Sequence, residues 1–234
     1  MKTVFTFLFL CCFPCFAKAQ SFAIISDKDG YVNVRKDNGA NSPIVGKIYS
    51  NDIFGYDEAD KSDWIKIYKQ NWEHENGSLE GYIHKSRIFP LSKFKSIKNV
   101  KSYKDSCVAV NDSLKIIIKS KLFNAKKHHL TYDRSETSIL RKIDGLHIWG
   151  TDGNMPKRKI SDVKLIKNGI SIIVPESAFD NLFEPNLGTL QIYLGKANTI
   201  YVEMDNSDGA GAYSVIWIIK NGQYLKRYID NSNA

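Results

Sequence analysis

The sequence predicts an all-β protein, with a small N-terminal barrel or sandwich followed by a larger β-rich domain that holds one short helix. Short β-branched and aromatic segments recur along almost the whole chain after residue 20. Turn dipeptides separate many of them: Asp29-Gly30, Asn76-Gly77, Asn168-Gly169 and Asn221-Gly222. A stretch rich in Lys and Ser with little apolar periodicity predicts a linker at residues 91–104. We therefore expect domains at residues 20–90 and 105–234.

The first nineteen residues have the pattern of a cleaved export signal. Lys2 precedes an apolar run over residues 4–16, and Ala17-Lys18-Ala19 provides the small-x-small cleavage pattern before Gln20. The apolar run is about a dozen residues, whereas a membrane span needs about 20. The cysteines of this segment do not follow a small residue, as a lipoprotein cysteine would. The sequence thus predicts a periplasmic, cell-surface or extracellular protein without stable membrane insertion after cleavage.

Cysteine content and charge narrow the function classes. After cleavage only Cys107 remains, so an internal disulfide or a cysteine-based zinc site is excluded. The formal net charge is +8, and loss of Lys2 and Lys18 lowers it to +6. The lysines are dispersed, which is typical of solvated faces rather than of a nucleic-acid site. Weak attraction to an anionic cell-wall polymer remains open.

The expected strands fall into two groups. The first group comprises residues 21–25, 31–35, 44–49, 64–68 and 81–88. The second comprises residues 114–118, 129–132, 146–149, 163–166, 170–174, 199–204, 212–219 and 224–229. The one helix is expected at residues 176–183, because Pro175 or Ser177 can open it and Glu184-Pro185 should end it.

Four blocks of the first group carry a family pattern in the same order. They are residues 30–35 (GYVNVR), 43–48 (PIVGKI), 64–67 (WIKI) and 81–88 (GYIHKSRI). Together these blocks resemble bacterial SH3 domains over about residues 21–90. Independently, Val32 and Val34 alternate with Asn33 and Arg35, which predicts one buried and one solvated strand face. The polar loops after Arg35 and at residues 69–79 depart from the family pattern.

The resemblance implies a module that binds cell-wall peptide or glycan, or that tethers a partner. Tyr31, Trp64 and Tyr82 are its candidate binding residues, although each large ring equally suits the core of a small domain. Three further stretches stand out in the second domain: residues 148–153, 184–186 and 203–213. The first offers Trp149 as a stacking platform and Asp152 as a polar contact, or else a buried strand end before a glycine turn.

Oxygen-bearing side chains crowd residues 205–208 before Gly209, which suits a hard cation such as calcium. The first ligand position of an EF-hand loop would be Met204, so that motif fails, and a tight turn between two strands is the favoured interpretation. We therefore predict no metal site and no cofactor.

Catalytic patterns are weak. Cys107 lies in an expected strand rather than at a helix N-terminus, where a peptidase nucleophile is activated. His128 and His129 are adjacent, so on a strand they point to opposite faces and cannot share a metal ion. We predict no catalytic residues and a non-enzymatic binding protein whose partner is cell-wall peptidoglycan or a protein, not nucleic acid. An inhibitor or immunity-type protein and a cell-wall hydrolase remain as alternatives.

Overall fold

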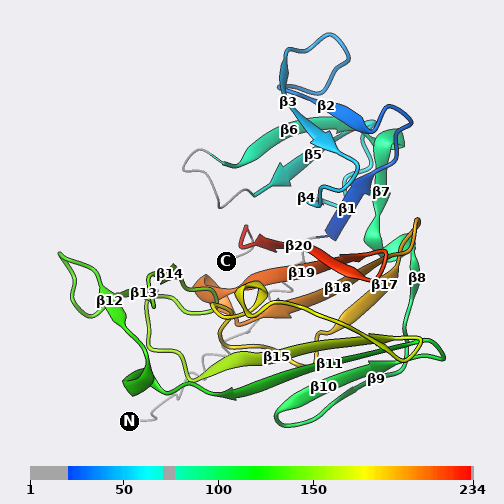
Figure 1. Cartoon of the computed structure of the whole chain (residues 1–234). Helices are drawn as coiled ribbons and strands as arrows, with labels where there is room; N and C mark the ends of the chain where they lie inside the picture. Colours follow the sequence, from blue (N-terminus) through cyan, green and yellow to red (C-terminus); the bar gives the residue numbers. More distant parts are fainter. Residues whose placement is uncertain (1–20, 71–76, 233–234) are drawn as a thin grey trace, which may run out of the picture.

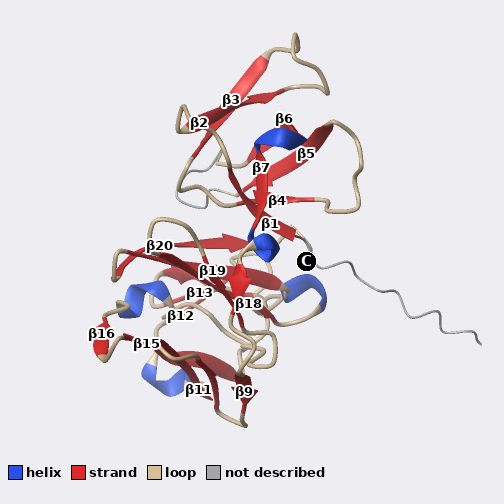
Figure 2. Ribbon diagram, turned by 90° about the vertical axis from the view of Figure 1, so that its right-hand side faces the viewer, coloured by secondary structure: helices blue, strands red, loops and turns tan. Residues whose placement is uncertain are grey.

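The computed structural model describes residues 21–70 and 77–232. The predicted signal segment at residues 1–19 and its cleavage point before Gln20 lie outside the described residues. The described chain is all-β, as predicted, and its only helical elements are short 3₁₀ turns. Within these residues no helix has the length and apolar character to cross a bilayer. Figures 1 and 2 show one small curled sheet standing on two larger stacked sheets.

The N-terminal unit (residues 21–70 and 77–90) is one curled sheet of seven strands in the order β3-β2-β6-β5-β4-β1-β7. Its strands are β1 (Ser21–Ile25), β2 (Tyr31–Arg35), β3 (Ile44–Tyr49), β4 (Phe54–Tyr56), β5 (Trp64–Lys69), β6 (Leu79–His84) and β7 (Ile88–Pro90). The expected strand at residues 81–88 is interrupted, because the 3₁₀ turn η1 (Lys85–Arg87) separates β6 from β7. The alternation predicted for β2 is seen only in part, since Val34 is fully buried whereas Val32, Asn33 and Arg35 are all half-buried.

Two glycines allow this sheet to curl tightly. A Cβ on Gly46 would lie 2.6 Å from the Leu79 side chain, and a Cβ on Gly81 would lie 2.4 Å from the Arg35 carbonyl oxygen. Gly81 therefore needs to lack a side chain, because the backbone of Arg35 cannot move away, whereas at Gly46 the flexible end of Leu79 would have to shift.

The rest of the chain forms a sandwich of two five-stranded sheets, which we call the outer sheet and the central sheet. The outer sheet has the order β16-β15-β11-β10-β9, with β9 (Val100–Ser102), β10 (Ser106–Val110), β11 (Leu114–Leu122), β15 (Arg158–Lys167) and β16 (Ile170–Ile172). The central sheet has the order β20-β19-β18-β17-β8, with β8 (Lys95–Ser96), β17 (Gln191–Leu194), β18 (Thr199–Asn206), β19 (Tyr213–Lys220) and β20 (Gln223–Asp230). A three-stranded flap adds β12 (Leu130–Tyr132), β13 (Leu140–Ile143) and β14 (Leu146–His147).

Two sequence predictions need correction. The segment 91–104 is not an irregular linker: after η2 (Leu91–Lys93), β8 pairs with β17 and β9 pairs with β10. The helix expected at residues 176–183 is only the 3₁₀ turn η4 (Glu176–Ala178). Residues after the turn pair instead with distant segments, through bridges from Leu182 to Trp149 and from Phe183 to Lys159. These tertiary contacts override the local helix signal.

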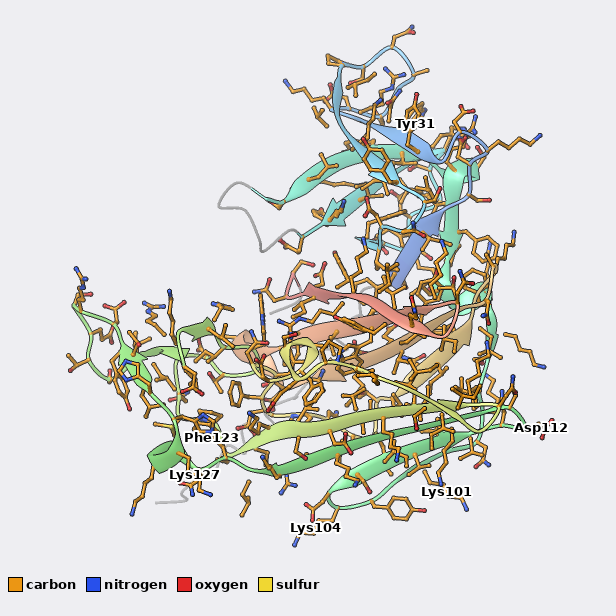
Figure 3. All side chains as sticks on the ribbon, in the orientation of Figure 1. Tyr31, Lys101, Lys104, Asp112, Phe123 and Lys127 are labelled. Atoms are coloured by element: carbon orange, nitrogen blue, oxygen red, sulfur yellow. The ribbon has the colours of Figure 1, made fainter. Side chains whose placement is uncertain are left out.

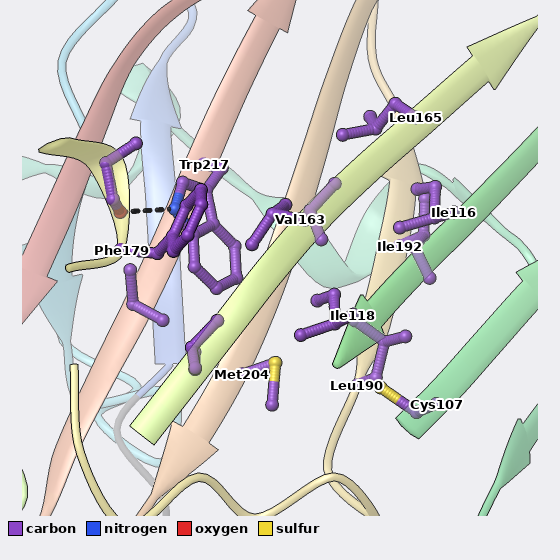
Figure 4. Close-up of a cluster of buried hydrophobic side chains, with 14 of the residues drawn as sticks. Cys107, Ile116, Ile118, Val163, Leu165, Phe179, Leu190, Ile192, Met204 and Trp217 are labelled. Carbon is purple, nitrogen blue, oxygen red and sulfur yellow. Dashed lines mark hydrogen bonds between the residues drawn. The ribbon is translucent and has the colours of Figure 1, made fainter. Parts of the chain in front are cut away.

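The central sheet is buried on both of its faces. Val202, Met204 and Trp217 belong to the sandwich core. Figure 4 shows Met204 and Trp217 with residues of the outer sheet such as Ile118 and Val163. Neighbouring residues on the opposite face, among them Tyr201 and Ile216, form a second core with Phe22, Ile53 and Leu91. The N-terminal unit is therefore packed directly onto the sandwich, and Figure 1 shows it above β18–β20.

Candidate functional site

The exposed side of the N-terminal unit carries a depression of about 490 Å³. Strand β2 contributes Tyr31, Asn33 and Arg35 to its wall, because alternate residues of a strand point to one face. Strand β5 adds Trp64, and β6 adds His84. Tyr31 lies far from the sandwich, in the outer part of the unit (Figure 3). The structure thus brings two of the predicted residues, Tyr31 and Trp64, into one site.

The aromatic rings of this depression are held by cross-strand contacts. Trp64 lies opposite His84 in the β5–β6 pair, with ring centroids 5.5 Å apart and planes nearly perpendicular at 83°. His84 Nδ1 is 2.8 Å from Ser86 Oγ, which fixes the orientation of the imidazole ring. The ammonium of Lys47 lies 4.1 Å from the centre of the Tyr31 ring. The depression therefore presents positioned rings, the usual means of holding sugars and peptides.

Polar groups complete the wall. Arg35 donates a hydrogen bond to the Ser42 carbonyl oxygen at 2.9 Å, and Arg87 forms an ion pair with Asp27. The Oδ1 atom of Asn33 is buried and accepts no hydrogen bond from the described residues. Sequence reasoning assigned Asn33 only to a solvated face and did not single it out.

Tyr82, the third predicted residue, is placed differently. It is half-buried on β6, opposite Arg35 of β2 and Lys66 of β5. It does not line the depression that contains Tyr31 and Trp64.

The three stretches singled out in the second domain meet at one place. Asp152, Glu184, Asn186 and Asp208 line a second depression of about 620 Å³. Hydrogen bonds between the loops fix it: Ser207 Oγ donates to the Gly150 carbonyl oxygen at 2.8 Å, and Asn186 N–H donates to Asn206 Oδ1 at 3.1 Å. Asp152 is exposed at this site, as a polar contact residue should be.

The oxygen-rich segment at residues 205–208 is divided between a strand and a turn: Asp205 and Asn206 end β18, and the connection to β19 begins at Ser207. Asp205 Oδ1 accepts a hydrogen bond from Ser214 Oγ at 2.6 Å, and Asn206 Oδ1 accepts one from Asn186. The predicted connection between two antiparallel strands is present, but it is shorter at its start than expected and contains the 3₁₀ turn η5 (Gly209–Gly211). Among the described residues no group of three or more His, Cys, Asp or Glu is suited to a metal ion.

Trp149 does not line either of these depressions. It is 5% exposed, its ring centroid lies 4.4 Å from that of His147, and it borders a third cavity where the N-terminal unit meets the sandwich. Trp149 therefore fits the alternative prediction, a buried residue before a glycine turn. The turn is made by Gly150, whose φ is positive at 103°.

A curled small sheet with an aromatic depression on its exposed side defines the N-terminal unit as an SH3-type binding module. The family model of the bacterial SH3 domain matches residues 30–88, so this unit is a bacterial SH3 domain. The match covers β2 to β6 and ends as β7 begins, leaving the sandwich outside it. A search of curated proteins finds no match to the chain. A search of solved structures also finds none.

Proposed function

We propose that the protein is an exported, non-catalytic binding protein whose SH3 domain engages cell-wall peptide or glycan. One observation carries the proposal: Tyr31, Trp64 and His84 line a single exposed depression together with the polar side chain of Arg35. Rings provide stacking surfaces for a sugar or peptide, and a few polar groups beside them orient the ligand.

The environment of Cys107 supports a non-catalytic role. The side chain is fully buried on β10, and burial raises the pKa of its thiol to about 11. A nucleophilic cysteine needs a lowered pKa and access to substrate. His128 is one of the histidines that a cysteine peptidase could use. Its Nδ1 atom lies instead 2.5 Å from Asp144 Oδ2, on the flap side of the molecule. These placements favour binding over peptide hydrolysis.

Co-sedimentation with isolated peptidoglycan, at low and at high salt, tests this function. We expect the protein to pellet at both salt concentrations, because ring stacking and hydrogen bonding are little screened by ions. Tyr31→Ala and Trp64→Ala should each abolish salt-resistant pelleting. Tyr103→Ala is the matched control, since Tyr103 is 57% exposed on the sandwich and should not affect binding.

Three outcomes would contradict the proposal. Pelleting that disappears at moderate salt would reflect only the positive charge of the chain. Absence of pelleting, with a co-purifying protein that Tyr31→Ala releases, would favour the inhibitor or immunity-type role. A lytic band in a peptidoglycan zymogram that Cys107→Ala or a chelator removes would make the protein a hydrolase.

A further inference from the structure

A depression of about 660 Å³ lies where β11 ends and the chain turns towards the flap. We call it the basic depression, because the described residues that line it contain no Asp or Glu and four lysines: Lys121, Lys126, Lys127 and Lys159. Phe123 and Lys127 mark this end of the molecule in Figure 3, well away from Lys101 on β9. The volume lies in the range of small-molecule sites.

Two of these lysines are cross-strand neighbours. Lys121 of β11 and Lys159 of β15 are direct partners in the antiparallel ladder. Side chains of such partners lie on the same face of the sheet, with Cβ atoms about 4.5–5.5 Å apart, and like charges in this arrangement destabilise the pair. Lys126 and Lys127 follow in the 3₁₀ turn η3 (Ala125–Lys127). The fold therefore gathers positive charge at one place against its mutual repulsion.

Lys159 is the unusual residue of the group. It is only 8% exposed, whereas lysine is almost never so fully covered unless it is paired. In the described part of the chain its ammonium forms neither a hydrogen bond nor an ion pair, yet Nζ is not one of the fully covered side-chain atoms that lack a partner. A lysine can bury its stem and keep its ammonium at an accessible surface. The ammonium of Lys159 therefore faces the depression without a counter-charge.

The acidic residue whose charge reaches Lys159 is engaged by two histidines. Asp144 Oδ2 is 2.5 Å from His128 Nδ1, and Asp144 Oδ1 accepts a hydrogen bond from the His129 N–H at 2.8 Å. These hydrogen bonds lower the pKa of Asp144 most, and the charge of Lys159 contributes least. None of the four lysines forms an ion pair with a described residue. The positive charge of the depression is thus in excess.

The same depression has a fixed apolar side. The centre of the Phe123 ring is 4.8 Å from that of His128, with planes nearly parallel at 24°, and 5.4 Å from that of Phe183, with planes nearly perpendicular at 87°. The neighbouring Leu122 is 73% exposed. A matching ligand therefore carries concentrated negative charge on a group attached to a carbon skeleton.

Among common anions a phosphate monoester fits these groups best. Lysine is a point charge that suits phosphate, whereas the planar fork of arginine is the better match for a carboxylate. A phosphate monoester carries a charge of about −1.5 to −2 at neutral pH and three acceptor oxygens, so that it can compensate two ammonium groups at once.

We propose that the basic depression binds a small, soluble phosphate monoester, with its phosphoryl oxygens on Lys121 and Lys159 and its organic part on Leu122 and Phe123. The concave form of the site favours a small ligand over a flat membrane surface. The proposal does not depend on what the SH3 domain binds, and Tyr31→Ala should leave it unaffected.

Isothermal titration calorimetry of the whole protein at pH 8 tests the site with three probes. Phenyl phosphate is a dianion there, phenyl sulfate has nearly the same shape but one charge, and inorganic phosphate lacks the organic part. We expect saturable binding of phenyl phosphate, about tenfold weaker binding of phenyl sulfate, and several-fold weaker binding of inorganic phosphate. Vesicles of phosphatidic acid, which present the same phosphate group on a lipid, should not pellet the protein.

Lys159→Gln and Lys121→Gln should each weaken binding of phenyl phosphate by about tenfold or more. Lys101→Gln, at an exposed lysine of β9, is the matched control and should leave binding unchanged. If Lys159→Gln does not fold, the exposed Lys121 and the three probes still decide the matter.

Three results would overturn this assignment. The first is no saturable binding of phenyl phosphate up to about 10 mM. The second is equal binding of phenyl phosphate and phenyl sulfate, or an equal loss in Lys101→Gln and Lys121→Gln, which would reflect only the net charge of the chain. The third is pelleting with phosphatidic acid vesicles in the absence of phenyl phosphate binding, which would make the depression part of a membrane-binding surface.

Discussion

The two faces of the central sheet are both buried, but the two cores that cover them differ in their polar groups. On the sandwich side, Trp217 and Tyr213 contribute the polar atoms of the core, and both are satisfied: Trp217 Nε1 donates to the Ala178 carbonyl oxygen at 2.8 Å and Tyr213 Oη to that of Phe183 at 3.0 Å. On the side of the SH3 domain, three tyrosines share the core with Phe22, and Glu203 and Asp52 are buried beside it.

This difference shows how the two domains are held together. The sandwich core relies on neutral side chains, so its stability should vary little with pH. The junction contains buried ionisable groups, whose free energies change with protonation. We infer that the sandwich sets the stability of the fold, whereas the attachment of the SH3 domain responds to pH.

The largest expected effect lies on the sandwich side. Trp217→Ala removes a fully buried indole and leaves the Ala178 carbonyl oxygen without its donor. The free energy of unfolding should fall by about 3–5 kcal/mol, as measured by denaturant titration. Leu225→Ala, at an exposed position of β20, should change it by less than about 0.5 kcal/mol. Equal losses for the two variants would show that this core is not the one that stabilises the protein.

Only part of the strand arrangement, and little of the burial of the central sheet on both faces, could be predicted from the sequence. Strands β1, β2 and β3 were predicted with their observed bounds, because Asp or Asn follows two residues after the end of each β-branched or aromatic run. Strands β8 and β17 were missed, since two to four residues carry little local pattern and pair with segments far along the chain. The uninterrupted apolar run at residues 215–219 is typical of a strand buried on both faces, but only a strand was predicted from it.

The candidate sites could likewise be predicted only where the local sequence carries a pattern. Tyr31 and Trp64 could be found because they belong to a family pattern, and the loop stretches of the sandwich because their composition is unusual. The cavity at the junction of the two domains could not be found, because its walls come from both domains and from segments far apart in the sequence. Only the folded chain reveals which polar atoms lack partners.

The second prediction concerns Glu203 and the pH dependence of stability at the junction. Burial raises the pKa of Glu203 to about 8, and the charge of Asp205 adds to the shift. The folded state therefore binds this proton more tightly than the unfolded state, and stability should fall as pH rises from 4.5 to about 8. One such group lowers the free energy of unfolding by at most about 1.4 kcal/mol per pH unit.

Glu203→Gln keeps the shape of the protonated acid and should remove this loss. The variant should match the unaltered protein below pH 4.5 and exceed its stability by about 2 kcal/mol or more above pH 8. Thermal unfolding across this pH range measures the difference. Glu136→Gln, on an exposed loop, should leave the profile unchanged. If the stability difference between Glu203→Gln and the unaltered protein did not change with pH, Glu203 would not be the source of the pH response.

A smaller effect with the opposite sign is expected at Asp52. Burial alone would raise the pKa of this carboxyl, but hydrogen bonds from Lys69, from the Tyr49 N–H and from Lys226 lower it below 3.8. Its stabilising contribution is thus present above pH 3.8 and disappears as pH falls through the lowered value. Asp52→Asn should cost about 1–3 kcal/mol at neutral pH and almost nothing in acid, as read from denaturant titrations at the two pH values.

The smallest effect separates hydrogen bonding from packing at the junction. Tyr228 Oη donates to Asp230 Oδ2 at 2.6 Å and accepts from the Gln70 N–H at 3.2 Å, so it links the SH3 domain to β20. Tyr228→Phe keeps the ring and its edge contact with Phe22 but removes both bonds. We expect a loss of about 1 kcal/mol at neutral pH. A loss near that of Trp217→Ala would mean that polar contacts, and not the shared apolar core, attach the SH3 domain to the sandwich.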